Sequence, residues 1–511
     1  MTPKLTISLN AIVPEYFNST SVSLVFLKSY VLHKWTQADF RHRPDITINT
    51  FFNEDDPETI IQTICSREPA IIGFAVYPWN FSIVQSIVSE TRERQPHALI
   101  VLGGPSVSFE AKKSMKRWPE ADIIVKGPGE ETFYQILQNH LNRESLAEVP
   151  NIVYRSGADI FENPFVANFS VEEQTYPLVT SDLEGREIIN YDTARGCTFR
   201  CNYCAWNVDG TEPWGVRYYP MEKVKGDLER IFTLDSLSKL LINDSNITLN
   251  ESRCIEIFRF INQLNARRRD RGQPFVMIVL DLNPQYFTDA VIVELKKMHI
   301  GVLGFGLQSI DENVLRIANR KFDRERYVRN LEKLSEKKGV QIIIEIIFGL
   351  PGDNLDTFRK NIEYYLSELK TYSFICFRFL VLPGSPFWSQ REKYGIVHQP
   401  DPPYDVISTR DFSEADLNYA DQLASWFELY FSIFRSIKKT IENHAAQTGQ
   451  PQVPIYEKLF ERLFPHYEDF FDRGWKQEHT YFYISKLRLK ENAHVRKQIL
   501  SDSRTILREL L

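Results

Sequence analysis

Short apolar runs alternate with stretches of helical periodicity along the first 140 residues. The apolar runs cover Leu5–Leu9, Ile46–Phe52, Ile71–Val76, Leu99–Leu102 and Ile123–Val125, with helical spacing between them, for example over Val22–Val31 and Ile83–Val88. Buried strands that alternate with helices are typical of a parallel sheet with helices on both faces. We therefore expect residues 1–140 to form a doubly wound α/β domain.

The pattern changes over residues 141–188, which are less regular and contain Pro150, Pro164 and Pro177. This composition indicates a linker. Within it, Ile152–Arg155 and Ile160–Phe161 flank a Ser-Gly pair, which predicts a short hairpin.

A strand followed by a helix recurs six times over residues 189–400. The first strand is predicted to end at the loop that contains Cys197. The later predicted strands are Leu240–Asn243, Phe275–Leu282, Val302–Ser309, Gln341–Phe348 and Phe374–Leu382, with helices over Ile255–Leu264, Val291–Met298 and Leu355–Leu369. Six such units predict an open, partial (β/α)6 barrel of the TIM type, whose chemistry lies at the carboxyl ends of the strands.

The last region, residues 401–511, is predicted to be a helical domain. Ser413 and Asp416 form a capping-box pattern ahead of an apolar stripe at helical spacing. The stripe consists of Leu423, Trp426, Phe427, Tyr430, Ile433, Phe434 and Ile437. Such a stripe is more typical of a core than of a cofactor surface, and the domain could close the open side of the barrel.

Composition and charge exclude several classes of protein. The 511 residues are 43% hydrophobic and 25% charged, as in soluble globular proteins of several domains. A net charge of −6 with interspersed signs gives no case for nucleic acid, and no apolar run is long enough to span a membrane. The residues after Met1 are not those of a secretory signal, so we expect a cytoplasmic protein with reduced cysteines.

Three of the six cysteines lie within eight residues, as Cys197, Cys201 and Cys204, with Tyr203 before the third. Thiolates packed this densely repel one another unless a metal neutralises them. A structural zinc site would need a fourth ligand, and Cys254 lies far away in the sequence. Three ligands would instead leave one position of an iron–sulfur cluster open. A zinc-stabilised scaffold without catalysis remains the non-enzymatic alternative.

The cysteine spacing and its surroundings resemble the radical S-adenosylmethionine (SAM) superfamily. The resemblance implies that the three cysteines hold a 4Fe–4S cluster and that the barrel strand ends contact SAM. The implied SAM contacts are Tyr203, Asp244, Asp281, Gln308, Ser309, Gly349 and Gly352. Arg195 is a candidate hydrogen-bond donor to the cysteine loop. The sequence identifies no catalytic side chain.

Three turns after the N-terminal strands resemble those of a Rossmann-like cobalamin-binding domain that precedes the radical SAM domain in one subfamily. Each turn alone is ordinary, but all three follow strand ends ahead of the cysteine motif. The implied cobalamin contacts are Tyr77, Trp79, Asn80, Gly103, Gly104, Pro105, Ser106, Gly127, Gly129 and Glu130. The Asp-x-His motif that supplies a cobalt ligand is missing after the first strand, and His33 is expected at the surface.

The resemblance implies a cobalamin-dependent radical SAM enzyme similar to the class B methyltransferases. Such an enzyme would methylate an unactivated carbon of a small-molecule or peptide substrate through a deoxyadenosyl radical and methylcobalamin. An external electron donor of the flavodoxin or ferredoxin type would supply electrons. Two alternatives stay open, namely a cyclisation or rearrangement without methyl transfer, and methyl transfer without hydrogen abstraction. A methylthiotransferase is disfavoured, because only Cys65 lies in the first 190 residues.

Overall fold

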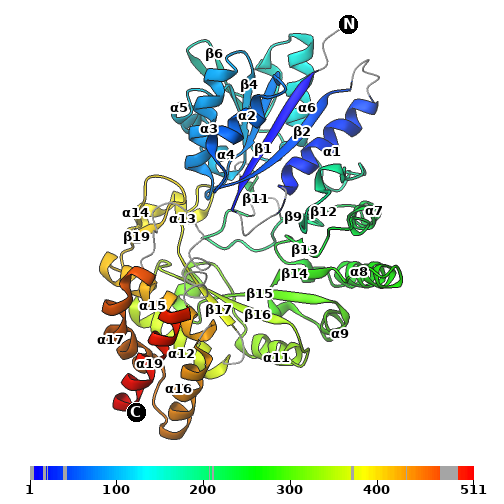
Figure 1. The fold of residues 1–511 in the computed structure, drawn as a ribbon. Coiled ribbons are helices and arrows are strands. Elements are labelled where there is room, and N and C mark those ends of the chain that lie inside the picture. The colour runs from blue at the N-terminus through cyan, green and yellow to red at the C-terminus, as the bar shows by residue number, and fades with distance from the viewer. Residues whose placement is uncertain are drawn as a thin grey trace.

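The computed structural model describes residues 5–14, 19, 21–37, 43–206, 208–209, 212–213, 215–369, 373–432, 434–471 and 493–511 (Figure 1). It contains two large sheets, each flanked by helices, and a helical C-terminal part. No helix in the described ranges is long and apolar enough to cross a membrane.

The first sheet is parallel over its first five strands. They are β1 (Thr6–Val13), β2 (Asp45–Phe52), β3 (Ile71–Ala75), β4 (Leu99–Gly103) and β5 (Ile123–Val125), in the spatial order β2-β1-β3-β4-β5. The helices of this region are α1 (Val22–Gln37), α2 (Pro57–Cys65), α3 (Phe81–Arg94), α4 (Pro105–Ser108), α5 (Ala111–Arg117) and α6 (Glu130–Asn142). One hydrophobic core lies under α1 and α6, and a second lies under α2, α3 and α5. Both faces are thus covered, and the predicted doubly wound sheet is confirmed.

A hairpin of β6 (Ile152–Ser156) and β7 (Asp159–Glu162) extends this sheet antiparallel to β5. The hairpin predicted in the linker is therefore part of the first sheet. The segment after it, which includes the short turn Ser181–Leu183, buries Phe169 and Tyr176 against Tyr30 of α1.

The second sheet has six parallel strands whose spatial order follows their sequence order. They are β8 (Ile188–Tyr191), β13 (Lys239–Ile242), β14 (Met277–Leu282), β15 (Ile300–Gln308), β16 (Gln341–Phe348) and β17 (Ser373–Arg378). The helices between them are α7 (Met221–Phe232), α8 (Glu251–Asp270), α9 (Asp289–Lys297), α10 (Glu312–Ile317), α11 (Arg324–Ser335) and α12 (Leu355–Glu368). This is the predicted partial (β/α)6 barrel, with β8 and β17 at its edges.

Short elements occupy the loops, and long helices follow the barrel. The short strands are β9 (Ala194–Gly196), β10 (Val208–Asp209), β11 (Glu212–Pro213), β12 (Val216–Tyr218), β18 (Val397–His398) and β19 (Val406–Ser408), and the short helices are α13 (Pro386–Ser389) and α14 (Arg391–Tyr394). The C-terminal helices are α15 (Glu414–Ser432), α16 (Arg435–Thr448), α17 (Val453–Phe471) and α19 (Ala493–Leu510).

Helix α15 lies beside the edge strand β17, where the Glu428 carboxylate accepts the Cys376 backbone N–H at 2.9 Å (Figure 1). The helical domain therefore covers this edge of the barrel. The aromatic stripe is core, as predicted, because Leu423, Trp426 and Phe427 are fully buried. The Tyr430 side chain and Ile433 lie outside the described residues.

Candidate functional site

The cysteine loop begins directly after β8 and is held by β9. Strand β9 pairs with β12 and ends at Gly196, whose φ of +83° turns the chain into Cys197. Cys197 and Cys201 are each 8% exposed, and Cys204 is half-buried. Burial and the neighbouring thiols of Cys201 and Cys197 raise the pKa of Cys204 to about 11, against the lowering effect of a backbone N–H.

Asp244 anchors the strand that leads into this loop. Its carboxylate accepts the backbone N–H groups of Thr193 at 2.7 Å and Ala194 at 3.1 Å, and also accepts the Thr193 hydroxyl. Burial raises the pKa of Asp244 to about 7, although these hydrogen bonds oppose the shift. Asp244, which was predicted to contact SAM, therefore forms hydrogen bonds within the protein that position β9.

Arg320 lies behind the cysteine loop, and nothing in the sequence alone singled it out. Its guanidinium donates to the Tyr203 hydroxyl at 3.0 Å and to the Gly306 carbonyl at 2.5 Å. The same group lies 3.9 Å from the Cys201 sulfur. A half-buried cation in this place favours anionic sulfur ligands nearby. Tyr203, the predicted aromatic neighbour of the cysteines, is oriented by this contact.

Gln308 closes β15 in a strained conformation. Its φ of +70° is rare for a residue other than glycine, and a bulge lies between Gly306 and Gln308. The side-chain oxygen of Gln308 is buried without a hydrogen-bond partner in the structure. Strain and an unsatisfied polar group together are typical of a ligand-binding position.

Two carboxylates face each other inside the barrel, Asp281 from β14 and Glu345 from β16. Gly304 lies between them, and a Cβ there would overlap Asp281 and approach Glu345. Burial raises the pKa of Asp281, and burial together with the charge of Asp281 raises the pKa of Glu345. Glu345 is the one charged residue in the otherwise apolar run Ile342–Phe348 of β16, and this is the signal by which sequence reasoning could have found it.

The remaining predicted SAM contacts shape turns. The Ser309 hydroxyl accepts the Asp311 backbone N–H at 3.1 Å and lies 3.4 Å from an Asn361 side-chain oxygen, so it is engaged within the protein. Gly349 and Gly352 have φ of +85° and +86°. A Cβ at Gly349 would lie 2.7 Å from Leu417 of α15, which brings this turn against the helical domain.

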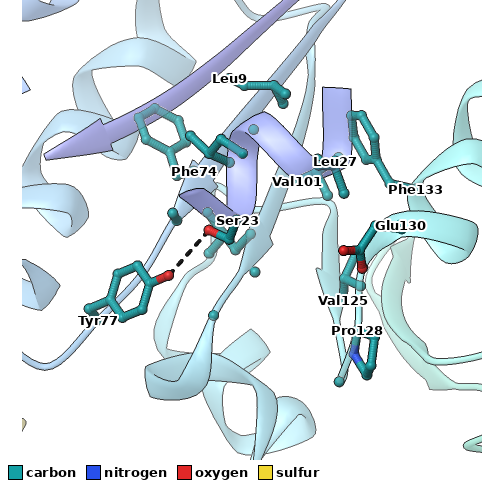
Figure 2. A pocket seen from close by; sticks show the side chains of 18 of the residues that line it. Leu9, Ser23, Leu27, Phe74, Tyr77, Val101, Val125, Pro128, Glu130 and Phe133 are labelled. Carbon is teal, nitrogen blue, oxygen red and sulfur yellow. Dashed lines mark hydrogen bonds between the residues drawn. The ribbon is translucent and has the colours of Figure 1, made fainter. Parts of the chain in front are cut away.

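An apolar cavity of about 270 Å³ opens at the carboxyl ends of the first sheet (Figure 2). Strands β1, β3, β4 and β5 form its floor, and α1 and α6 form its walls. The lining includes Leu9, Ser23, Leu24, Leu27, Gly73, Phe74, Tyr77, Val101, Gly103, Gly104, Gly127, Pro128, Gly129, Glu130, Phe133, Asp192 and Arg195. Six of the predicted cobalamin contacts are brought together here, whereas Trp79, Asn80, Pro105 and Ser106 are not in the lining.

Gly104 occupies a position where no side chain can be accommodated. Its φ is +106°, and a Cβ would lie 2.5 Å from the Val76 carbonyl oxygen. Pro105 then starts α4, and Ser106 follows with a buried hydroxyl that has no partner in the structure.

The turn after β3 stacks two aromatic side chains. The rings of Tyr77 and Trp79 lie 4.5 Å apart and are nearly parallel, and the buried Trp79 indole N–H has no partner in the structure. The Tyr77 hydroxyl lies 3.2 Å from Ser23 of α1 (Figure 2). Asn80 instead braces the turn, since its amide donates to the Ile12 and Ala75 carbonyls.

Glu130 joins the cavity to the cysteine loop. The Arg195 guanidinium donates to the Glu130 carboxylate at 2.5 Å, and their side chains are 17% and 4% exposed. Arg195 also lies over the rings of Phe26, Phe169 and Tyr219, at 5.4 to 5.6 Å. Arg195, two residues before Cys197, was predicted to donate to the cysteine loop, but its guanidinium donates to Glu130, a predicted cobalamin contact.

The donor sets fit the groups that the sequence implied. Three neighbouring thiols beside the half-buried Arg320 suit an anionic iron–sulfur cluster. The unpartnered Gln308 oxygen at the barrel mouth can accept a hydrogen bond from a bound ligand. The glycine-lined apolar cavity, with the unpartnered groups of Ser106 and Trp79 near it, suits the corrin and nucleotide of cobalamin. His33 is half-buried on α1, within 3.1 Å of the Gln37 amide nitrogen, and is not in the cavity lining.

Comparison with known proteins agrees with this geometry. Residues 191–365 match the radical SAM superfamily, and residues 40–137 match the B12 binding domain. The chain is 25% identical to 2-(S-pantetheinyl)-carbapenam-3-carboxylate methyltransferase of Streptantibioticus cattleyicolor, over 67% of this chain and 53% of that protein. It is 23% identical to the cobalamin-dependent radical SAM methyltransferase TokK of Streptomyces tokunonensis, over 64% of this chain and 50% of TokK. The chain thus spans about half the length of these curated relatives.

A solved structure shows the same fold. The cobalamin-dependent SAM radical enzyme OxsB, determined with aqua-cobalamin and SAM bound, superposes with a TM-score of 0.67 at 15% identity. The alignment covers 99% of this chain and 80% of OxsB. The two matched domains imply a 4Fe–4S cluster, SAM and cobalamin as cofactors. The chain therefore carries a B12 binding domain followed by a radical SAM domain, and its fold is that of the cobalamin-dependent SAM radical enzyme OxsB.

Proposed function

We propose that the chain is a methyltransferase that adds a methyl group to an unactivated carbon of a small-molecule or peptide substrate. The contact between Glu130 and Arg195 carries this proposal, because it joins the wall of the cobalamin cavity to the strand that enters Cys197. Two cofactors held side by side can act on one substrate without its release. The methyltransferase names of two relatives support the same reading.

Each cofactor has its own set of residues in this proposal. The cluster is held by Cys197, Cys201 and Cys204. SAM is contacted by Tyr203, Asp281, Gln308, Gly349 and Gly352, whereas Asp244 and Ser309 position the surrounding backbone. When bound, the cluster with SAM supplies a carbon radical that removes a hydrogen atom, and cobalamin supplies the methyl group.

The chain's own contribution is to orient groups and to limit access of water. Arg320 fixes the Tyr203 ring beside the cysteines, and Glu345 with Asp281 offers carboxyl groups at the centre of the barrel. Burial and the nearby charge of Asp281 raise the pKa of Glu345 to about 7, so this carboxyl group can donate or accept a hydrogen bond near neutral pH. Helix α15 shields the β17 edge, so the reacting groups are approached from the strand ends.

One observation favours a second candidate, methyl transfer without hydrogen abstraction. No His is among the described residues that line the cavity, so the lining offers cobalt no imidazole ligand. The identity of the ligand that a protein offers to cobalt alters how readily a methyl group leaves the cobalt. A cyclisation or rearrangement without methyl transfer is the third candidate and predicts a product of unchanged methyl content.

Product analysis separates the candidates. The anaerobic, reconstituted protein is incubated with a reductant, candidate substrates and SAM that carries a deuterated methyl group. Radical methylation predicts a labelled product, with 5′-deoxyadenosine and S-adenosylhomocysteine formed in equal amounts. S-adenosylhomocysteine alone with labelled product identifies the second candidate, and 5′-deoxyadenosine without label identifies the third. Cofactor-loaded protein that cleaves no SAM under any condition would contradict the proposal.

A further inference from the structure

A cationic patch lies on the outer side of the cysteine loop. We define it by Arg200, Arg316, Lys321 and Arg326, whose side chains are all exposed. Within the described ranges none of the four forms an ion pair with an acid, whereas the neighbouring Arg324 pairs with Glu368. Four unpaired cations in one place stand out on a chain with a net charge of −6.

The acids of the same stretch only partly offset the patch. Asp311 and Asp323 are the N-caps of α10 and α11, where their carboxylates accept backbone N–H groups. Their charges are therefore directed at the helix termini. Glu312 and Glu325 are the exposed acids that remain between residues 311 and 326. The local balance is cationic.

The patch lies directly against the segment that carries Cys201. The Asn319 side chain donates to the Arg200 carbonyl at 2.7 Å, and the Asn202 N–H donates to the Ala318 carbonyl at 2.9 Å. Arg320, in the same stretch, lies 3.9 Å from the Cys201 sulfur. Residues 316–321 therefore lie directly against the segment that carries Cys201, a predicted cluster ligand.

An open hollow of about 470 Å³ lies within the patch. Tyr286 and Phe322 contribute aromatic surface to it, and Lys321 and Arg326 lie at its rim. The Tyr286 ring contacts Phe199 of the cysteine loop, with ring centroids 5.1 Å apart. Asp323 also lines the hollow, as the N-cap of α11. Aromatic surface beside exposed cations is typical of a contact site for an acidic protein.

We propose that this patch docks a small acidic one-electron carrier of the flavodoxin or ferredoxin type. The inference rests on the proposed function, which requires a reductant for the cluster. In the docked complex one electron leaves the carrier, which is oxidised by one unit, and the cluster is reduced by one unit. Because the rest of the chain carries an excess of negative charge, the patch also selects the orientation of the carrier.

The test compares a protein reductant with a small one. Cluster reduction in the fully loaded protein is followed by stopped-flow absorbance, with flavodoxin hydroquinone, reduced ferredoxin or photoreduced 5-deazariboflavin as donor. The variants are Lys321→Glu with Arg326→Glu, and the control Arg269→Glu, which reverses an exposed cation on α8. Binding of oxidised flavodoxin and ferredoxin to the cluster-free chain is measured in parallel at low salt.

The double variant is expected to lower the rate with at least one protein donor by about tenfold or more at low ionic strength. That loss should shrink on addition of salt, since screening weakens exposed charge pairs. The rate with deazariboflavin, the iron content and the Arg269→Glu rates should stay within about twofold of wild type. Equal rates in the double variant and wild type, equal losses in the control, or no reduction by either protein donor would overturn the docking proposal. Normal cluster reduction without SAM cleavage would instead count against the proposed function and leave the docking site standing.

Discussion

The buried ion pair between Glu130 and Arg195 offers a demanding test of how the two cofactor regions are joined. The pair has side-chain exposures of 4% and 17%, and three aromatic rings surround the guanidinium. Replacing Arg195 with Met leaves the Glu130 carboxylate buried without its partner. Removal of one member of a buried pair costs about 3–5 kcal/mol. The loss is expected near the lower bound, because Arg195 retains some access to water.

A double-mutant cycle separates the pair from its surroundings. Glu130→Leu with Arg195→Met removes both charges, and replacement of a whole buried pair by apolar groups is often close to neutral. The double variant should therefore be more stable than the sum of the single losses predicts, by about 2 kcal/mol or more. An exposed pair, Arg267 with Glu229, serves as control, and Glu229→Gln should cost less than about 1 kcal/mol.

The assay is urea unfolding of the cluster-free chain, followed by circular dichroism, with hydroxocobalamin affinity measured on the same samples. Because Glu130 and Arg195 both line the cavity, each single variant should also bind hydroxocobalamin more weakly. A cost below about 1 kcal/mol for Arg195→Met, which is the range of a surface pair, would refute the reasoning. Additive losses in the double variant would refute it equally.

Three further predictions concern single positions. Gly104→Ala should abolish hydroxocobalamin binding while cluster assembly continues, because a Cβ would lie 2.5 Å from the Val76 carbonyl; retained binding in a cobalamin titration would contradict this. Asp244→Ala should lower iron incorporation, since the Thr193 and Ala194 N–H groups lose their acceptor at about 1–3 kcal/mol each. The pKa of Asp244 is raised from 3.8 to about 7 in the folded chain, so the stability that this group contributes is fully present below pH 4 and is lost as the pH rises toward 7. Wild type should therefore lose stability relative to Asp244→Asn over that interval in urea unfolding, and parallel pH profiles would count against the assignment. Gln308→Gly removes a strained φ of +70°, so thermal stability should hold or rise while SAM affinity of the loaded protein falls about tenfold; lower stability with unchanged affinity would show that Gln308 is structural.

Hydrophobic patterning predicted the two sheets well because most of their strands are apolar runs in which at least every second residue is buried. Ile123–Val125 and Gln341–Phe348 are strands with the predicted bounds, and most other strand ends shift by one or two residues. The largest differences are four residues, at the ends of β1 and β17. The hairpin at residues 152–162 was predicted as part of a linker, but it pairs with β5. Local turn chemistry identified the hairpin, whereas its partner strand depends on a tertiary contact.

The side-chain roles were harder to predict, because they depend on partners distant in the sequence. Asp244 follows a strand end, as expected for a SAM contact, but its hydrogen-bond donors lie about 50 residues earlier, at Thr193 and Ala194. Arg320 lies in a polar loop without a recognisable pattern, and only the fold brings it to Cys201. The turns at Gly104, Gly349 and Gly352 were easier to predict, since few residues other than glycine adopt the positive φ found there.

The metal and cobalamin content of the reconstituted protein tests the central claim most directly. The protein would be purified without oxygen, reconstituted with iron and sulfide in the presence of hydroxocobalamin, and analysed for iron, sulfide, cobalt and zinc. About four irons and one cobalt per chain are expected, with the absorption of both groups in the visible spectrum. Iron without cobalt would remove cobalamin from the account, and zinc without iron would contradict the assignment of the cysteine loop itself.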